Sequence, residues 1–266
     1  MKEKIISIIN QKGGVGKTTT VINLAAGLSL NNKKVLVIDL DPQGNATTGL
    51  GLSNIDQTSN SIYQVLIGTK KIDEAISKTN FSNLDIITSN VDLSGLEVET
   101  ADDSGRAYIL KEKLTAYLNN SRASYDYVLI DCPPSLSLLT VMALVASHSL
   151  LVPLQTEFFA LEGITQLIKT IDRIKAGLNP ELTIRGILLT MYDKRNKLSS
   201  EVETEARNYF KEKVYKNVVP RNVRLSEAPS HGMPVIFYDK NCPGSKSYIN
   251  FTEEFLAQGE SFETAA

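Results

Sequence analysis

The sequence predicts an α/β fold in which a mostly parallel, twisted sheet is flanked by helices on both faces. Short runs rich in Ile, Val and Leu alternate with amphipathic stretches of helical length, which is typical of βα units that build a parallel sheet. These runs lack a regular polar face, as expected of strands buried on both sides. The expected strands are 4–9, 34–39, 84–88, 127–131, 149–153 and 184–190, and the clearest expected helices are 17–30, 106–119, 136–146, 163–175, 200–213 and 245–257.

Length and composition indicate one globular unit. The chain has 266 residues, 42% hydrophobic and 22% charged, so we expect a single domain over residues 1–266. The formal net charge of −2 leaves any nucleic-acid contact to a local basic patch. The two cysteines form no CxxC pair, which disfavours a disulfide framework and fits the cytoplasm. We expect no membrane span, because His148 and Pro153 interrupt the most apolar stretch.

A glycine-rich segment follows the first expected strand and leads directly into the first helix. Residues 10–20 read Asn-Gln-Lys-Gly-Gly-Val-Gly-Lys-Thr-Thr-Thr. Glycines let successive N–H groups point inward and the helix N-terminus adds positive potential, so the segment predicts a phosphate-binding loop. Lys17 is expected to reach the β- and γ-phosphates of a nucleotide, and Thr18 to bind Mg²⁺ through its hydroxyl. The predicted nucleotide contacts here are Lys12, Gly13, Gly14, Val15, Gly16, Lys17, Thr18 and Thr19.

This loop departs from the common pattern GxxxxGK[ST] at two positions. Gln11 stands in place of the first glycine, and an extra lysine appears at Lys12. The segment KGGVGKTTT resembles the deviant Walker A motif of ParA, MinD, the nitrogenase iron protein and the arsenite-pump ATPases. The resemblance implies a P-loop ATPase that uses ATP and Mg²⁺, in which Lys12 crosses a face-to-face homodimer interface to the partner's nucleotide. Charge neutralisation by both subunits would then require the closed dimer, which couples nucleotide state to assembly.

Acidic residues close the second and fourth expected strands. Asp39 and Asp41 end the second strand and Asp131 ends the fourth, where ligands of such sheets bind. By resemblance to the same family, Asp41 acts in catalysis with Lys12 and Lys17 by orienting the attacking water, whereas Asp39 and Asp131 support Mg²⁺ from its outer shell. A capped turn is the alternative for the first two acids, and an ordinary turn acid for the third.

Cys132 adjoins the last of these acids and invites comparison with the nitrogenase iron protein, whose dimer shares an iron–sulfur cluster. The other thiol, Cys242, lies near the C-terminus, where the spacing does not fit that family's second ligand. We therefore expect both cysteines to be packing groups.

Beyond these motifs, the chain resembles ParA of the chromosomal, Soj-like kind nearly end to end. The segments that carry this match are 41–51, 153–163 and 219–232. The resemblance implies that Pro220, Arg221 and Asn222 form the adenine side of the nucleotide site, and that Glu157 and Glu162 serve the dimer interface. The alternatives are that Pro220 only ends a strand and that Arg221 is a solvated surface charge.

A local basic excess indicates how such a protein would hold DNA. Residues 190–224 contain nine Lys or Arg residues against five Asp or Glu residues, an excess of 9 − 5 = 4, which suits sequence-independent phosphate binding. By family resemblance, Arg195 and Arg224 are the expected DNA contacts. For the lysines, a solvated helix face with ion pairs between neighbouring turns is the alternative.

The resemblance also implies the partners and the cycle. ATP closes the dimer, the dimer binds the nucleoid through non-specific double-stranded DNA, and a ParB-type centromere-binding protein stimulates an otherwise weak ATPase. Fewer than ten residues precede the phosphate loop, so we expect no N-terminal helix-turn-helix domain. A chromosomal and a plasmid system both remain open.

Two other functions are weighed against this one. A MinD-like ATPase positioned on the membrane would need a basic amphipathic C-terminal helix, whereas this chain ends in an acidic segment. We therefore expect no membrane partner. A metabolic P-loop ligase or kinase would instead be marked by a small-molecule pocket and by turnover without DNA.

Overall fold

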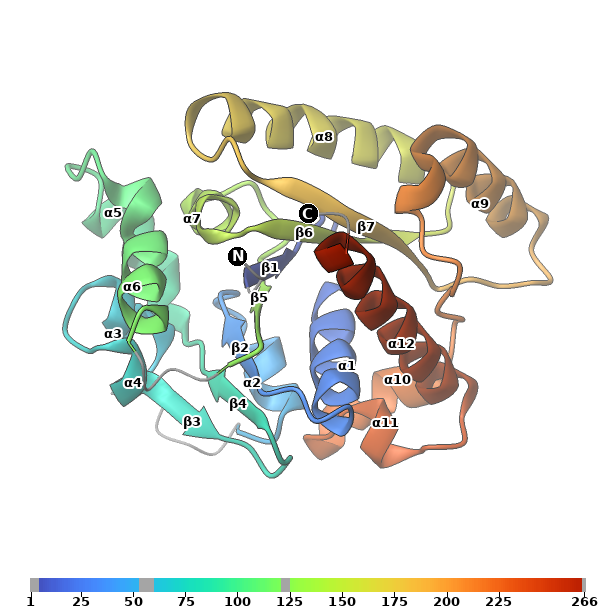
Figure 1. Cartoon of the computed structure of the whole chain (residues 1–266), viewed down its shortest axis with the longest axis horizontal. Coiled ribbons are helices and arrows are strands. Elements are labelled where there is room, and N and C mark those ends of the chain that lie inside the picture. The colour runs from blue at the N-terminus through green and yellow to red at the C-terminus, as the bar shows by residue number, and fades with distance from the viewer. Residues whose placement is uncertain (1–4, 53–59, 121–124, 265–266) are drawn as a thin grey trace.

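A seven-stranded sheet is the centre of the structure, a computed structural model that describes residues 5–52, 60–120 and 125–264, with side chains up to residue 258 (Figure 1). The strand order is β3-β4-β2-β5-β1-β6-β7, and all neighbours are parallel except β3 and β4. The predicted α/β class with a mostly parallel sheet is confirmed. The strands are β1 Ile5–Ile8, β2 Val35–Asp39, β3 Ile76–Lys78, β4 Leu84–Ile87, β5 Tyr127–Asp131, β6 Ser149–Gln155 and β7 Thr183–Thr190.

All six predicted strands are present with small shifts at their ends. The expected start of the first strand, Lys4, lies outside the described residues. The edge strand β3 was not predicted, because its three residues Ile-Ser-Lys contain a single apolar side chain and form no recognisable run. Its antiparallel pairing with β4 extends the sheet by one short edge strand.

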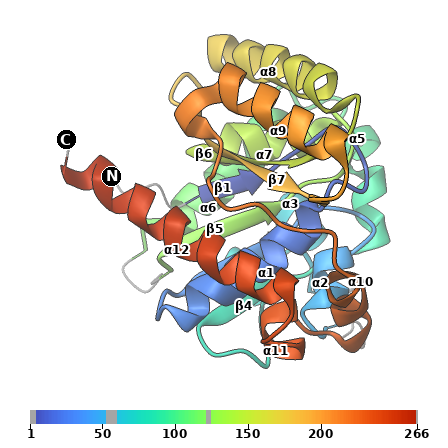
Figure 2. The ribbon, with the colours of Figure 1, turned by 90° about the vertical axis from the view of Figure 1, so that its right-hand side faces the viewer.

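Helices lie on both faces of the sheet (Figures 1 and 2). The first helix has the predicted bounds, and the last is longer at both ends than predicted. The short helices α2 to α5, α10 and α11 were not predicted, because four or five residues are too few to show helical periodicity. The helices are α1 Lys17–Leu30, α2 Asn45–Gly49, α3 Ile62–Leu66, α4 Ile72–Ala75, α5 Leu96–Glu99, α6 Ile109–Leu118, α7 Leu138–Ala146, α8 Ala160–Gly177, α9 Lys197–Phe210, α10 Val223–Glu227, α11 Val235–Tyr238 and α12 Pro243–Thr264.

The end of α9 differs from the prediction for a backbone reason. The helix was expected to reach residue 213, but Lys211 has φ = 50°, which interrupts the right-handed helix. The last three predicted residues, Lys211–Lys213, form a 3₁₀ turn.

The apolar stretch 136–154 is divided between helix α7 and strand β6. Within the described ranges, no helix combines the length and apolarity needed to cross a bilayer.

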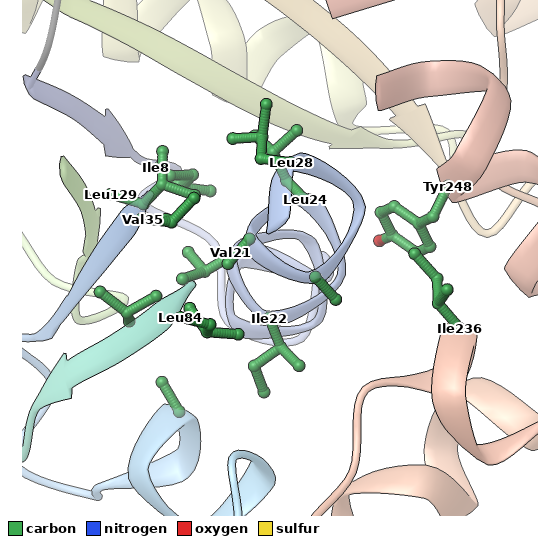
Figure 3. Close-up of a cluster of buried hydrophobic side chains, with 14 of the residues drawn as sticks. Ile8, Val21, Ile22, Leu24, Leu28, Val35, Leu84, Leu129, Ile236 and Tyr248 are labelled. Atoms are coloured by element: carbon green, nitrogen blue, oxygen red, sulfur yellow. The ribbon is translucent and has the colours of Figure 1, made fainter. Parts of the chain in front are cut away.

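Alternating side chains of the strands supply the cores on the two faces of the sheet. Ile6 and Ile8 point into a cluster with α1, α11 and α12, whereas Ile5 belongs to the cluster with α6 and α7 on the opposite face. Figure 3 shows α1 between the sheet on one side and Ile236 and Tyr248 on the other. Each fully buried Ile or Leu side chain contributes about 2 kcal/mol relative to exposure. This packing fixes α1, and with it the phosphate loop at its N-terminus.

Gly27 lies where α1 packs tightly against α12. A Cβ at this position would lie 2.9 Å from Cβ of Thr252 and closer still to its hydroxyl oxygen. Gly163, in α8, is also helical but is exposed, and a Cβ there would have no neighbour within 4 Å. Both glycines are helical, so they differ only in the room that a Cβ atom would have.

We predict that Gly27→Ala lowers the free energy of unfolding by about 1–3 kcal/mol through overpacking. The matched control Gly163→Ala should raise it by about 0.4–1 kcal/mol, because alanine restricts the unfolded chain without a clash. Urea denaturation followed by circular dichroism measures both values. A neutral or stabilising Gly27→Ala would contradict the packing of α12 against α1 described above.

Candidate functional site

The glycine-rich loop between β1 and α1 is held in place from two sides. Thr190, at the end of β7, donates its Oγ1 proton to the carbonyl of Val15 over 2.8 Å. Asn10 donates from Nδ2 to the carbonyl of Pro153 (2.8 Å), while its Oδ1 accepts from the amide of Lys12 (3.0 Å). The neighbouring strands thus fix the loop to the carboxyl edge of the sheet.

Two glycines give the loop its shape. Gly14 and Gly16 have φ values of 73° and 90°, in the left-handed region that side chains with a Cβ rarely adopt. Around Gly14 the space that a Cβ would point into is open within 4 Å. A glycine-rich backbone with open space beside it, at the N-terminus of α1, is suited to binding anions such as phosphate.

Lys17 places a positive charge inside this loop. Its side chain is buried, and Nζ donates to the carbonyl of Lys12 over 3.0 Å. Burial lowers the pKa of Lys17, and the nearby Asp131, Cys132 and Asp41 oppose this shift. The ammonium therefore lies where an anion bound by the loop would compensate its desolvation.

Asp39 and Asp131 are adjacent at the ends of two neighbouring strands. They are paired in the β2–β5 register and both are fully buried. Oδ2 of Asp39 accepts from both the amide and the hydroxyl of Thr47, each at 2.7 Å, and Oδ1 accepts from the amide of Asp41 at 3.3 Å. Burial raises the pKa of Asp39 to about 6, although the hydrogen bonds from Thr47 oppose the shift.

Asp131 has much weaker compensation. Within the described residues, neither of its carboxylate oxygens has a hydrogen-bond partner. Burial, followed by the charge of Asp39, raises its pKa well above the ordinary value, and the nearby Thr18 hydroxyl and Lys17 charge lower it only in part. A buried carboxylate without partners is costly, and a divalent cation is the group that such an acid beside a threonine hydroxyl fits.

The same region contains no complete protein-made metal centre. Across residues 5–52, 60–120 and 125–264, no group of three or more His, Cys, Asp or Glu side chains is arranged to hold a metal ion. A cation here would therefore take further ligands from water or from a phosphate, which is how Mg²⁺ usually binds in proteins.

Asp41 begins the loop that follows β2 and is oriented by its neighbours. The residue is only 7% exposed, and its Oδ1 accepts from the amide of Gln43 over 3.0 Å. Its carbonyl accepts from the amide of Gly44 and, at 2.5 Å, from the hydroxyl of Ser89, which follows β4. A nearly buried carboxylate with a fixed orientation is suited to positioning a water molecule.

Lys12 lies differently from Lys17. Its side chain is 47% exposed, and its ammonium forms an ion pair with Glu157, in the segment after β6, and not with an acid of its own loop. The adjoining hollow, about 680 Å³ in volume, is lined in part by Phe159, Glu162 and Lys169. The charge of Lys12 is thus presented at the surface beside the loop.

The segments that resemble the Soj-like branch come together around this site. Segment 153–163 contacts the phosphate loop through the Pro153 carbonyl and the Glu157 carboxylate. Segments 41–51 and 219–232 meet at Gly51 and Gly232, where a Cβ on Gly232 would lie 2.7 Å from the Gly51 Cα. Both of these glycines have positive φ values. Sequence reasoning found the segments but not their contacts.

The three residues expected at the adenine side lie at the start of α10. Tyr192 forms a β-bridge with Pro220, and the amide of Arg221 donates to the carbonyl of Tyr192 over 3.1 Å. Asn222 is the N-cap of α10, since its Oδ1 accepts from the amide of Arg224 at 3.0 Å. The backbone of this loop is therefore fixed.

The two arginines expected to contact DNA are both exposed and both paired with acids. Arg195 is 90% exposed at its side chain and donates to Asp193, with Nη2 and Oδ2 at 2.9 Å. Arg224 is half exposed and pairs with Glu227 at 2.7 Å and with Asp239 at 3.4 Å.

The two cysteines are free thiols buried in hydrophobic clusters. Burial, followed by the charge of Asp131, raises the pKa of Cys132 to about 12. Both behave as packing groups in the structure.

Sequence reasoning missed several residues that support the site. Thr47 holds Asp39, Ser89 holds the loop of Asp41, and Thr190 holds the phosphate loop. Thr47 and Thr190 lay in segments that had been singled out for other reasons, 41–51 and 190–224. Ser89 and Thr190 are polar residues at or just after the ends of strands β4 and β7, and this position is the sequence signal that could have found them.

Comparisons with known proteins find relatives that match most of the chain. A family model described as an AAA domain matches residues 3–184. The chain is 50% identical over 255 residues to the chromosome partitioning protein ParA of Caulobacter vibrioides, covering 96% of this chain and 94% of that protein. It is 48% identical over 256 residues to the sporulation initiation inhibitor protein Soj of Bacillus subtilis, covering 96% and 99%.

A solved structure extends the similarity to three dimensions. The crystal structure of cobyrinic acid a,c-diamide synthase from Mycobacterium smegmatis, with bound ADP and magnesium, matches with a TM-score of 0.83 and 33% identity over 98% of this chain and 96% of that one. The family model covers more than half of the chain, and the two relatives match it almost end to end. The chain therefore belongs to the ParA/Soj family of chromosome-partitioning P-loop ATPases.

Proposed function

We propose that this chain is an ATP-dependent dimerisation switch that partitions DNA. Two ATP-bound copies form a sandwich dimer that binds DNA without sequence preference, and a ParB-type centromere-binding protein stimulates the hydrolysis that releases it. The observation that carries the proposal is the cluster of buried charges, Lys17, Asp39 and Asp131, beside an open glycine-rich loop. Charges buried at this cost are expected where a ligand neutralises them.

The nucleotide is proposed to bind with its phosphates in the loop. Backbone amides and Lys17 would hold the β- and γ-phosphates, and Pro220 and Asn222 would face the adenine. Thr18, with Asp131 and Asp39 further out, would hold Mg²⁺, which neutralises phosphate charge when bound. The M. smegmatis structure with ADP and magnesium supports this assignment by analogy.

Hydrolysis is assigned to Asp41 and a water molecule. The carboxylate, oriented by the amide of Gln43, would accept a hydrogen bond from the attacking water and direct its lone pair at the γ-phosphate. In this proposal, the only cationic residues that stabilise the transition state are the two lysines of the phosphate loop. Intrinsic ATP hydrolysis should therefore be slow, and it should become faster when a partner protein completes the site.

Lys12 is proposed to act on the nucleotide of the second copy. Its ammonium pairs with Glu157 at the surface, away from its own loop. Beside it, Phe158 and Phe159 stack edge to face and are 73% and 63% exposed. Exposed aromatic pairs of this kind favour coverage by another protein, and a second copy would bring its nucleotide to Lys12.

DNA binding is assigned to Arg195 and Arg224 on the surface of the ATP-bound dimer. Binding would exchange their carboxylate partners for phosphate oxygens and release counterions, so it should be sensitive to salt. It would also place the protein on the nucleoid. Doubling of the basic surface on dimerisation explains why ATP would control DNA affinity.

If Asp131 helps to bind a cation, its replacement should stabilise the protein without ligand but weaken the binding of Mg²⁺. A carboxyl whose pKa is raised on folding favours the fold below its unfolded pKa and loses that contribution as the pH rises through its folded pKa. We therefore expect Asp131→Asn to raise the free energy of unfolding at pH 8, without nucleotide or metal, by about 1 kcal/mol or more. The gain should shrink toward pH 4.

Urea denaturation at the two pH values, in the presence of a chelator, measures this effect. The same variant should lose the increase in melting temperature that Mg²⁺ and ATP give the unmodified protein. The control Asp126→Asn removes an acid at a strand's opposite end and should keep that increase. An Asp131→Asn protein that is less stable at pH 8 would contradict the absence of a partner for this carboxylate.

A variant that cannot hydrolyse ATP tests the switch itself. Asp41→Ala should persist with ATP as a dimer that stays bound to DNA, because only the step that resets the switch is removed. Adding Arg195→Ala and Arg224→Ala to it should weaken DNA binding at least about tenfold while the dimer and its nucleotide affinity remain.

Gel filtration with light scattering and DNA-binding titrations with ADP and ATP measure these properties. Asp41→Ala protein that is monomeric with ATP would rule out the proposed dimer. Unchanged DNA retention by the triple variant would remove the two arginines from the DNA surface.

A further inference from the structure

A β-bridge brings the two proposed DNA-binding arginines onto neighbouring segments. The chain after β7 and the chain before α10 run side by side, with Tyr192 donating from its amide to the carbonyl of Val219 (3.0 Å) and accepting from the amide of Arg221 (3.1 Å). Figure 2 shows the chain descending from α9 to α10 along the face turned toward the viewer. Arg195 follows the first of these segments and Arg224 follows the second.

Arg221 is close to the surroundings of both arginines. On one side, its charge acts on Asp193, the partner of Arg195: the pKa of Asp193 is lowered to about 2, chiefly by the hydrogen bonds from Arg195 and to a smaller extent by Arg221. On the other side, Arg221 lines the same hollow of about 570 Å³ as Arg224. The three arginines therefore belong to one stretch of surface.

The state of Arg221 differs from that of its neighbours. Arg195 and Arg224 each form ion pairs, whereas Arg221 is exposed and has no ion-pair partner in the described part of the chain. Phosphate binding at Arg221 would not first require a carboxylate to be released. The polar residues Asn222 and Asn241 and the start of α12 at Pro243 also line the hollow, as does one acid, Asp239.

We propose that Arg221 contacts a DNA phosphate, and that Arg195, Arg221 and Arg224 form one strip that follows a single phosphodiester backbone. This assignment replaces the adenine-side role that resemblance implied for Arg221, and it rests on the proposed DNA-binding function. Backbone contacts of this kind position a protein on the duplex without reading its sequence. The strip thus accounts for non-specific binding by a chain whose net charge is negative.

The test compares Arg221→Ala with Arg221→Lys, each combined with Asp41→Ala so that the ATP form persists. The probe is a fluorescent duplex of random sequence titrated at several salt concentrations, and a fluorescent ATP analogue reports nucleotide affinity. Arg221→Ala should weaken DNA binding roughly three- to tenfold and lower the salt slope by about one per protomer. Arg221→Lys should keep most of the affinity, and neither should change nucleotide affinity. The control is Arg106→Ala in the turn before α6, since α6 and α10 lie far apart in Figure 1.

The outcomes separate this inference from the function on which it rests. If Arg221→Ala lowers nucleotide affinity and leaves DNA binding unchanged, Arg221 belongs to the adenine side and the inference is wrong. If Arg195→Ala and Arg224→Ala weaken DNA binding but Arg221→Ala does not, the strip is wrong while the proposed function stands. If none of the three changes DNA binding, the proposed DNA surface fails as well.

Discussion

The adjacent carboxylates of Asp39 and Asp131 are the constraint on which the site depends. A parallel sheet brings the ends of β2 and β5 to the same edge, and the register pairs these two acids in the interior. Thr47 stabilises one of them, but the other has no hydrogen-bond partner within the described residues. Because unpaired buried charge destabilises a fold, this arrangement supports the proposal that a cation binds beside Asp131.

The two lysines of the phosphate loop, near Asp39 and Asp131, differ in exposure. Lys17 is buried within its own loop, whereas Lys12 is exposed and held by Glu157. A triphosphate with Mg²⁺ would bring more negative than positive charge, which one buried lysine cannot neutralise. A lysine from a second copy is the simplest remaining source, and this requirement would make assembly depend on the nucleotide. The close contact of Gly51 with Gly232 joins the Asp41 segment to the one that carries Arg224.

The features that could be predicted from the sequence are those that depend on a local pattern of residues. Buried strands follow from runs of branched side chains, the phosphate loop from its glycines, and the location of Asp39 and Asp131 at the ligand-binding edge of the sheet from their places at strand ends. Sequence reasoning missed β3 and the short helices, which are too brief to show a period. It also missed contacts between distant segments, such as Thr190 with Val15 and Tyr192 with Pro220, because no local pattern records which loops meet. The position of Arg221 beside Arg224 and Asp193 depends on the last of these contacts.

The central claim is that Lys12 serves the nucleotide of the other subunit, and mixed dimers test it most directly. Lys12→Ala protein has its own Asp41 but cannot serve a partner, and Asp41→Ala protein has the reverse defect. If Lys12 acts across the interface, mixing the two inactive variants creates one complete site per mixed dimer, so ATPase activity should reappear and follow the fraction of mixed dimers. If Lys12 acts within its own subunit, each mixed dimer contains only incomplete sites. Absence of activity in mixtures where mixed dimers are demonstrated would contradict the account.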